Sequence, residues 1–210
     1  MGLFKKKIKC PYCENVLEKQ LKRKKKCPHC EKYIFVRDHI MVTEEYAEII
    51  DSLKMFEFSV QQYLESKKEL GERFGHEPKC RDVIWHICNG EIIKNRNDNG
   101  ILGTLYHNMA ILLDSEGKDA FQMLRQSAKA RLQSYKQMGT EILDILVGDD
   151  CPGCKLLEGK VYKIDEALDQ MPIPHKNCTN VRHNKRGGFC TCQYWPTSEE
   201  AFEYRIRGDR

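Results

Sequence analysis

Cysteine and histidine side chains near the C-terminal end of the chain have the spacing of metal ligands. Cys151 and Cys154 are separated by two residues, and His175 and Cys178 repeat this spacing after an interval of twenty residues. A pair with this spacing can fold into a tight turn that aims both side chains at one point, and two pairs complete a tetrahedral zinc site. The sequence therefore predicts that these four residues bind one zinc ion.

Two more cysteines offer an alternative set of ligands for this site. Cys190 and Cys192 follow a basic loop, and Cys190 could replace His175 as the fourth ligand. We favour His175 because its spacing to Cys178 mirrors that of the first pair and closes a smaller loop. Cys190 and Cys192 alternate like strand residues and would then pair with the strand that contains Val161.

The N-terminal end of the chain has the same paired spacing, with cysteine at all four positions. The sequence Cys-Pro-Tyr-Cys is followed by thirteen residues and then Cys-Pro-His-Cys, which is the pattern of a zinc ribbon whose two turns share one ion. The segment has few apolar residues, so the free energy of metal binding would also be its free energy of folding. We therefore expect two zinc ions per chain. The predicted N-terminal ligands are Cys10, Cys13, Cys27 and Cys30.

The cysteine count and the composition favour a reducing compartment. The chain has 210 residues and eleven cysteines, an odd number that falls mostly in close pairs, which favours metal binding over disulfides. No apolar run approaches the roughly 18 residues needed to cross a bilayer. The opening residues are basic and lack the apolar segment of a signal peptide. We expect a cytoplasmic protein that has no membrane partner.

Positive charge is concentrated at the N-terminal end. Residues 1–37 contain twelve Lys or Arg against three Glu, a net charge of +9, so the remaining residues carry −5 of the total of +4. Such a patch can neutralise phosphates and predicts non-specific contact with a nucleic-acid backbone, although a solvated hairpin tip would have the same composition. Tyr12, Tyr33 and Phe35 are the candidates for base stacking, and they do not form a cluster with the lysines in the sequence. The predicted nucleic-acid-binding residues are Lys5, Lys6, Lys7, Lys22, Arg23, Lys24, Lys25 and Lys26.

Helical periodicity dominates the middle of the chain. Apolar residues recur at helical spacing from Thr43 to Phe74, which predicts one long amphipathic helix with Thr43 as its N-cap. A break within this helix is the alternative. Pro78 suits the first turn of a second helix, because proline has no N–H to leave unsatisfied there. Further helices are expected over residues 101–113 and 120–138.

These elements define a fold class and a domain organisation. The chain is predicted to be mainly α, with two small zinc-stapled β modules. The C-terminal module should contain a buried strand over residues 142–147 and a second strand through Val161. The predicted order is a basic zinc ribbon over residues 1–40, a helical array over residues 41–139 and a zinc-binding α+β module over residues 140–210.

The remaining cysteines and histidines do not predict a third metal site. Cys80 and Cys88 are more than two helical turns apart, so they do not form a compact pair. His86 and His107 are isolated in the sequence. Buried thiols and hydrogen-bonded histidines are far commoner than ligands in such positions, and we expect these roles here.

The C-terminal motif carries a resemblance. The segment that runs from Cys151 and Cys154 through Leu-Glu-Gly-Lys-Val to Pro-His and Cys178 resembles the C-terminal signature of phage Mu F-like head-morphogenesis proteins. The likeness covers about residues 140–180 and includes Gly159 and His175, but the family's Cys-Arg-Cys continuation is replaced here by Cys-Thr-Asn. The whole chain also resembles uncharacterised zinc-ribbon proteins of prophages and mobile elements in Gram-positive bacteria. The resemblance implies an origin in a mobile element.

The sequence favours a non-enzymatic function. A zinc ion with four protein ligands has no open position for an activated water, so the expected role is an adaptor that contacts nucleic acid through the ribbon and binds a protein partner or a second copy through the rest. A phage head-assembly component is the first alternative. A zinc-stapled, metal-dependent nuclease that uses His175, Asn177 and His183 is the second, but the sequence provides no separate hard-metal site and general base beside them.

Overall fold

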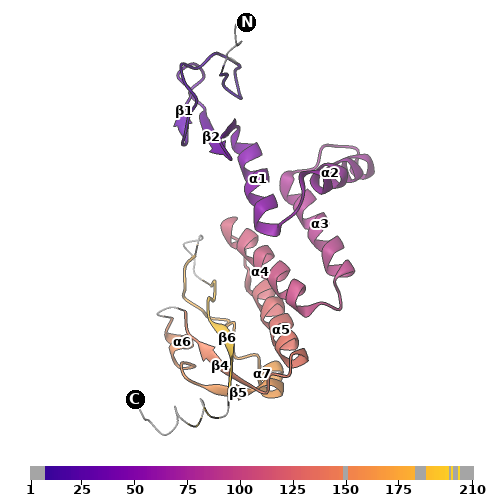
Figure 1. Ribbon diagram of the computed structural model, residues 1–210, viewed down its shortest axis with the longest axis vertical. Coiled ribbons are helices and arrows are strands. Elements are labelled where there is room, and N and C mark those ends of the chain that lie inside the picture. The colour runs from indigo at the N-terminus through magenta and orange to yellow at the C-terminus, as the bar shows by residue number, and fades with distance from the viewer. Residues whose placement is uncertain (1–7, 149–150, 183–187, 199, 201–202, 204–210) are drawn as a thin grey trace, which may run out of the picture. The chain divides into compact units, whose positions relative to one another are not determined.

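The computed structural model describes residues 8–148, 151–182, 188–198, 200 and 203 (Figure 1). Within them the chain forms seven helices and six short strands and is mainly helical, as predicted. It divides into two compact units, residues 1–87 and residues 88–210. The boundary falls inside helix α3 (Cys80–Lys94), within the segment that the sequence assigned to a single helical array.

The first unit begins with a small antiparallel sheet. Strands β1 (Lys25–Lys26), β2 (Tyr33–Arg37) and β3 (Ile40–Val42) lie in the order β1-β2-β3. We call residues 8–42 the ribbon module. Its core contains the buried side chains of Leu17 and Ile34 and otherwise consists largely of cysteine, so it buries little apolar surface of its own. A module of this size with so small a core needs another source of stability.

Two helices follow the ribbon module where the sequence predicted one. Helix α1 (Glu44–Phe56) begins at the predicted N-cap, Thr43, whose side chain accepts a hydrogen bond from a backbone N–H of the first turn. It ends because Glu57 adopts a left-handed conformation and the next N–H, of Phe58, bonds back to a carbonyl of the last turn. Ser59 then caps helix α2 (Val60–Phe74). The single long helix predicted from periodicity is therefore wrong, and the break was the correct alternative.

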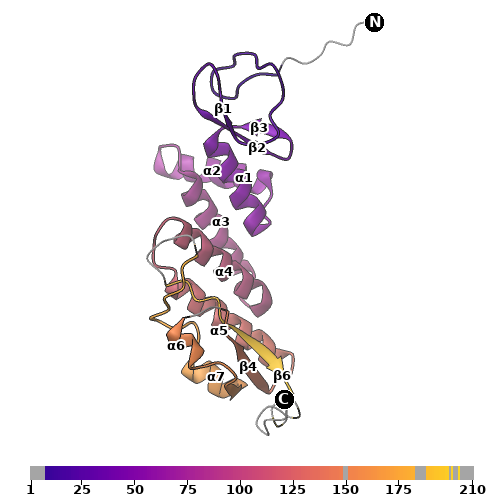
Figure 2. The same ribbon diagram turned by 90° about the vertical axis from the view of Figure 1, so that its left-hand side faces the viewer.

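The second unit contains a pair of closely packed helices. Helices α4 (Asn99–Ser115) and α5 (Phe121–Gln137) lie side by side (Figures 1 and 2). The hydroxyl of Ser127 donates to the backbone carbonyl of Gly103 across the pair, with an oxygen–oxygen distance of 2.6 Å. A side chain at residue 103 would meet Arg131, because its Cβ would lie 2.9 Å from the Arg131 Cγ. The glycine thus permits this close approach.

A second sheet packs against α5. Its strands lie in the order β5-β4-β6, and all pairs are antiparallel. The central strand β4 (Ile142–Leu146) confirms the predicted buried strand, and β5 (Val161–Lys163) and β6 (Gln193–Thr197) flank it. The short helices α6 (Pro152–Lys155) and α7 (Ile164–Gln170) lie in the β4–β5 connection and after β5.

The core of the second unit joins the sheet to the helices. Side chains from β4, α7, β6 and one face of α5 form one buried cluster, so the sheet is anchored on a helix. Among the described residues, no helix combines the length and the apolar character that a bilayer crossing requires.

Candidate metal centres

The structure brings together all four cysteines predicted at the N-terminal site. Their sulfur atoms lie within 4.8 Å of one another, and the Sγ–Sγ distance is 3.9 Å for Cys10 and Cys30 and 3.9 Å for Cys13 and Cys27. A disulfide would need about 2.05 Å. Zn–S bonds of about 2.3 Å in a tetrahedron give sulfur–sulfur edges of about 3.8 Å. The group therefore has the dimensions of a four-thiolate metal site.

The two cysteine turns of the ribbon module have the same local geometry. In the first turn, the N–H of Tyr12 donates to the Cys10 sulfur at 3.4 Å, and the N–H of Glu14 donates to the Cys10 carbonyl at 3.0 Å. Both bonds recur around Cys27 in the second turn, with the same distances. The residue after the second cysteine is left-handed in both turns, with φ of 58°. Backbone N–H groups that point at sulfur stabilise thiolate, which is the form that binds metal.

The thiols of this group also differ in acidity. Burial raises the pKa of the Cys27 thiol, but hydrogen bonds from the backbone of His29 and Cys30 outweigh it and lower this pKa to about 6. Burial raises the pKa of the Cys10 thiol. Packing several sulfurs together disfavours a second negative charge, and a divalent cation removes this penalty.

Five cysteines converge in the second unit. The sulfurs of Cys151, Cys154 and Cys178 lie within 4.8 Å of one another, and Cys154 also belongs to a second group of this size with Cys190 and Cys192. The Cys154 and Cys190 sulfurs are 3.9 Å apart, again the separation expected across a tetrahedral site. The cluster could therefore hold a metal ion with thiolate ligands alone.

Short-range structure positions the first three of these sulfurs. Cys151 caps helix α6, so that Cys154 lies one turn further on, and the Cys178 N–H closes a turn on the carbonyl of His175 at 3.1 Å. The N–H of Thr179 donates to the Cys151 sulfur at 3.5 Å. Burial raises the pKa of the Cys151 thiol, but this bond and other backbone donors outweigh it and lower the pKa to about 6.

His175 occupies a different place from the predicted one. Its ring nitrogens are not part of either group of ligand atoms. The imidazole lies against Gly153, where an added Cβ would be 2.8 Å from its Cε1 atom, and its Nδ1 accepts the N–H of Asn177 at 3.3 Å. The ring thus lies beside the Cys151–Cys154 turn, and the sulfur of Cys190 lies 3.9 Å from that of Cys154. The Cys190 sulfur therefore lies next to Cys154, as in the alternative ligand set, and is grouped there with the sulfur of Cys192.

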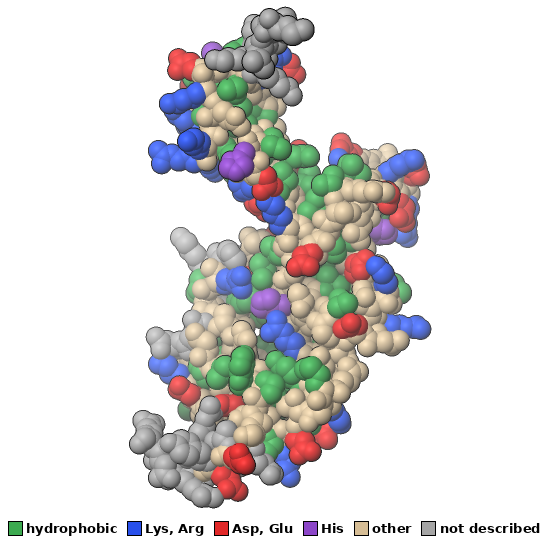
Figure 3. All heavy atoms as spheres, in the orientation of Figure 1, with side chains coloured by type: hydrophobic (Ala, Val, Ile, Leu, Met, Phe, Trp, Pro, Cys, Tyr) green, Lys and Arg blue, Asp and Glu red, His purple; other side chains and the backbone are tan. Residues whose placement is uncertain are grey.

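The predicted basic residues fall into two sets. Lys5, Lys6 and Lys7 lie outside the described residues. The run from Lys22 to Lys26 is exposed along its whole length, and Figure 3 shows Lys and Arg side chains gathered on the ribbon module. Within the described residues, none of these five side chains has a carboxylate within 4.0 Å, whereas Arg37 and Lys54 of the same unit each pair with an aspartate.

Aromatic rings lie directly beside these lysines, which the sequence analysis missed. The Lys24 Nζ is 4.8 Å from the ring centroid of Tyr33 and 4.2 Å from that of Phe35, and the Lys26 Nζ is 5.3 Å from the Tyr33 ring. Strand pairing sets Lys26 opposite Tyr33. The signal was present in the sequence Tyr-Ile-Phe-Val-Arg, because alternate residues of a strand share a face. We call Lys24, Lys26, Tyr33 and Phe35 the basic–aromatic face.

Of the residues considered for a nuclease, His175 belongs to none of the metal-ligand groups found among the described residues. His183 lies outside the described residues. Cys80, Cys88 and His86 belong to none of the ligand groups found in the described residues.

Comparisons with protein-family models, with curated proteins and with solved structures found no match for this chain. The two cysteine centres and the surface of the ribbon module are the features of the chain that point to a function.

Proposed function

We propose that the protein is a zinc-stapled, non-enzymatic adaptor that contacts nucleic acid through its ribbon module. The observation that carries this proposal is the basic–aromatic face, where exposed lysines lie over aromatic rings and have no carboxylate partner in the described residues. Lysines neutralise phosphates, and aromatic rings stack with bases without regard to sequence. The combination suits non-specific binding.

Zinc is the ion that we propose for both centres. Tetrahedral sets of four thiolates select zinc or iron–sulfur chemistry, and zinc is the usual structural ion in closed sites of this size. The sulfur separations of 3.9 Å at both centres support this assignment. In the second centre we propose Cys151, Cys154, Cys178 and Cys190 as ligands. Four protein ligands leave no position for a metal-bound water, which is why we propose a structural role.

We also propose that the rest of the chain binds a protein partner or a second copy of itself. Helix α2 exposes the apolar side chains of Val60 and Leu64, which lie one turn apart on the same face. The resemblance to head-morphogenesis proteins keeps a structural role in phage assembly as the alternative. A mass measurement at several concentrations would detect self-association through such a face.

The experiment that tests the nucleic-acid contact compares two triple variants by fluorescence anisotropy with a 20-nucleotide single strand. Replacing Lys22, Lys24 and Lys26 with Gln should weaken binding and reduce the slope of log affinity against log salt by about 2, since each phosphate contact contributes about 0.7. The control replaces three exposed lysines of the second unit, Lys129, Lys160 and Lys163, and removes the same charge. Equal effects of the two variants, or no binding by the native chain at low salt, would exclude the proposed contact.

A further inference from the structure

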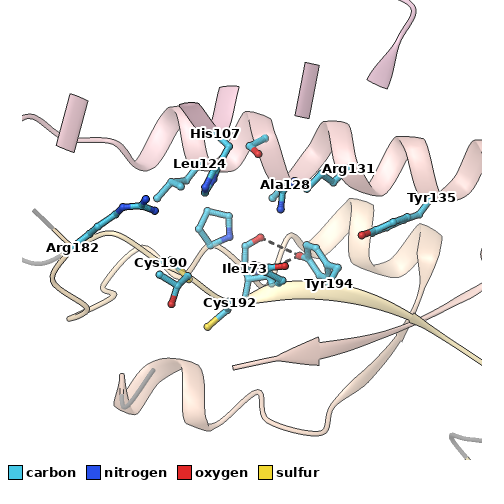
Figure 4. Close-up of a pocket in the computed structure, with 14 residues that line it drawn as sticks. His107, Leu124, Ala128, Arg131, Tyr135, Ile173, Arg182, Cys190, Cys192 and Tyr194 are labelled. Carbon is cyan, nitrogen blue, oxygen red and sulfur yellow. Dashed lines mark hydrogen bonds between the residues drawn. The ribbon is translucent and has the colours of Figure 1, made fainter. Parts of the chain in front are cut away.

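A small cavity in the second unit carries a concentration of positive charge. Its volume is about 120 Å³, and it lies between helix α5 and the segment that leads into strand β6 (Figure 4). Among the lining residues that the structure describes, His107, Arg131 and Arg182 carry titratable or charged nitrogen groups, and none is Asp or Glu. Within the described residues, neither guanidinium has a carboxylate within 4.0 Å.

One buried ring orients two of these groups. Phe189 is 1% exposed, and the His107 ring meets it edge-on with 6.0 Å between centroids. The guanidinium carbon of Arg182 lies 5.0 Å from the same ring centroid. Figure 4 shows the side chains of His107 and Arg182 approaching the cavity from different segments of the chain. Phe189 therefore acts as a common support for both.

The third group is held by the helix pair. The aliphatic part of Arg131 lies against Gly103, with no room for a Cβ there, so the packing of α4 on α5 fixes where its side chain runs. Neutral polar side chains complete the polar part of the lining, among them Ser127, Tyr135 and Thr191. The side chains that line the cavity therefore come from two helices and a loop.

The positive charges that line the cavity repel one another. Burial and the nearby Arg131 and Arg182 lower the pKa of His107 to about 4, so its imidazole is neutral at pH 7 and can still donate one hydrogen bond. Two like charges that face one space repel each other, and an anion between them would reverse the sign of this interaction. Guanidinium groups bind planar or tetrahedral oxyanions with paired hydrogen bonds.

We propose that this cavity binds a phosphate group, either free phosphate or the terminal phosphate of a larger molecule, held by Arg131, Arg182 and His107. Its volume of about 120 Å³ has room for one phosphate group. The site is separate from the basic–aromatic face, so this proposal does not depend on the function proposed for the ribbon module.

The test is isothermal titration calorimetry of the zinc-loaded full chain in chloride buffer, with inorganic phosphate as the probe. Saturable binding at one site per chain is the expected result. Arg131→Gln and Arg182→Gln should each weaken it by about tenfold or more, which is the usual effect of removing one charge-assisted hydrogen bond. The matched control is Lys129→Gln, which removes one positive charge from the exposed side of the same helix and should change the affinity by less than about twofold.

Two further arms identify the source of the phosphate. If a 5′-phosphorylated dinucleotide binds more tightly than inorganic phosphate, the ligand of the cavity is the 5′-phosphate of a nucleic-acid end. If it binds equally or more weakly, the ligand is the free phosphate ion. The same dinucleotide with a 5′-hydroxyl should not bind the cavity. Phosphate binding should also move the His107 ring resonances in the NMR spectrum and raise the pKa of that ring.

The outcomes that would overturn the proposal are equally specific. They are no saturable binding of either phosphate probe, or the same affinity in Arg182→Gln as in the native chain. Because Arg182 is exposed and lies in a loop, this variant remains informative even if Arg131→Gln fails to fold.

Discussion

The Nζ atom of Lys24 lies 4.2 Å from the centroid of the Phe35 ring and 4.8 Å from that of Tyr33. The ammonium group of Lys24 therefore lies near two aromatic rings of strand β2. The Tyr33 side chain remains 48% exposed. The ribbon module therefore presents charge and ring surface together, which is what a single strand of nucleic acid requires for its phosphates and its unpaired bases.

The first prediction concerns base stacking. Tyr33→Ala should weaken binding of a single strand by about 1–3 kcal/mol, the usual contribution of one stacked base, and should affect duplex binding less because paired bases offer no free face. Anisotropy titrations with a single strand and a duplex of the same sequence would measure the difference. Tyr46→Ala, at an equally exposed tyrosine on α1, is the control. An unchanged single-strand affinity in Tyr33→Ala would mean that the rings only support the lysines.

The second prediction separates the two ligand sets of the C-terminal centre. Cys190→Ser should reduce zinc retention at this centre, whereas His175→Ala should keep the ion, because the His175 ring lies against Gly153 and outside the sulfur groups. Zinc retained after dialysis against a chelator would be measured for both variants. Retention in Cys190→Ser and loss in His175→Ala would restore the histidine set.

The third prediction concerns backbone strain in the ribbon module. Glu14 and Glu31 both have a φ of 58°, a conformation that costs a residue with a Cβ about 1 kcal/mol relative to glycine. Glu14→Gly and Glu31→Gly should therefore stabilise the zinc-bound module by up to about 1 kcal/mol each. Denaturation of the zinc-loaded chain would measure it. Glu18→Gly, at an exposed residue without positive φ, should be neutral or destabilising.

The fourth prediction is a dependence of stability on pH. The pKa of His107 is lowered to about 4 in the folded chain, against an unfolded value of about 6.5. Between these values the unfolded chain binds a proton that the folded chain does not, so this group makes stability fall as pH decreases from about 6.5 to 4. Partial solvent exposure of the ring reduces the effect to about 1–2 kcal/mol.

The variant His107→Gln should lack this pH-dependent contribution. As the pH falls from 6.5 to 4, the free energy of unfolding of the variant should therefore rise by about 1–2 kcal/mol relative to that of the native chain. Thermal unfolding across this range measures the difference, and the same replacement at the exposed His76 controls for the loss of one imidazole. A difference that stays constant with pH would contradict the argument.

The parts of the structure that depend on local spacing could be predicted from the sequence. The turns around Cys10 and Cys27 follow from two-residue spacing, and the Thr43 cap follows from the preference of its hydroxyl for a helix N-terminus. The strand at residues 142–146 follows from its apolar run. In each case the partners are near one another in the chain.

The parts of the structure that depend on contacts between residues far apart in the sequence could not be predicted. Cys190 reaches Cys154 across 36 residues because β6 pairs with β4, and no spacing rule encodes that pairing. The break after Phe56 depends on a left-handed Glu57, which periodicity does not show. The phosphate-sized cavity brings together residues from two helices and a loop, and therefore has no linear motif.

We expect divalent ions bound by thiolates to stabilise the fold around both cysteine centres. The most direct test is the metal content of the purified chain, measured by mass spectrometry of the elements together with a count of free thiols. We predict two zinc ions per chain, falling to one in Cys27→Ser and to one in Cys154→Ser, with every cysteine of the two centres reduced. Less than one ion per native chain, or disulfide bonds among these cysteines, would contradict it.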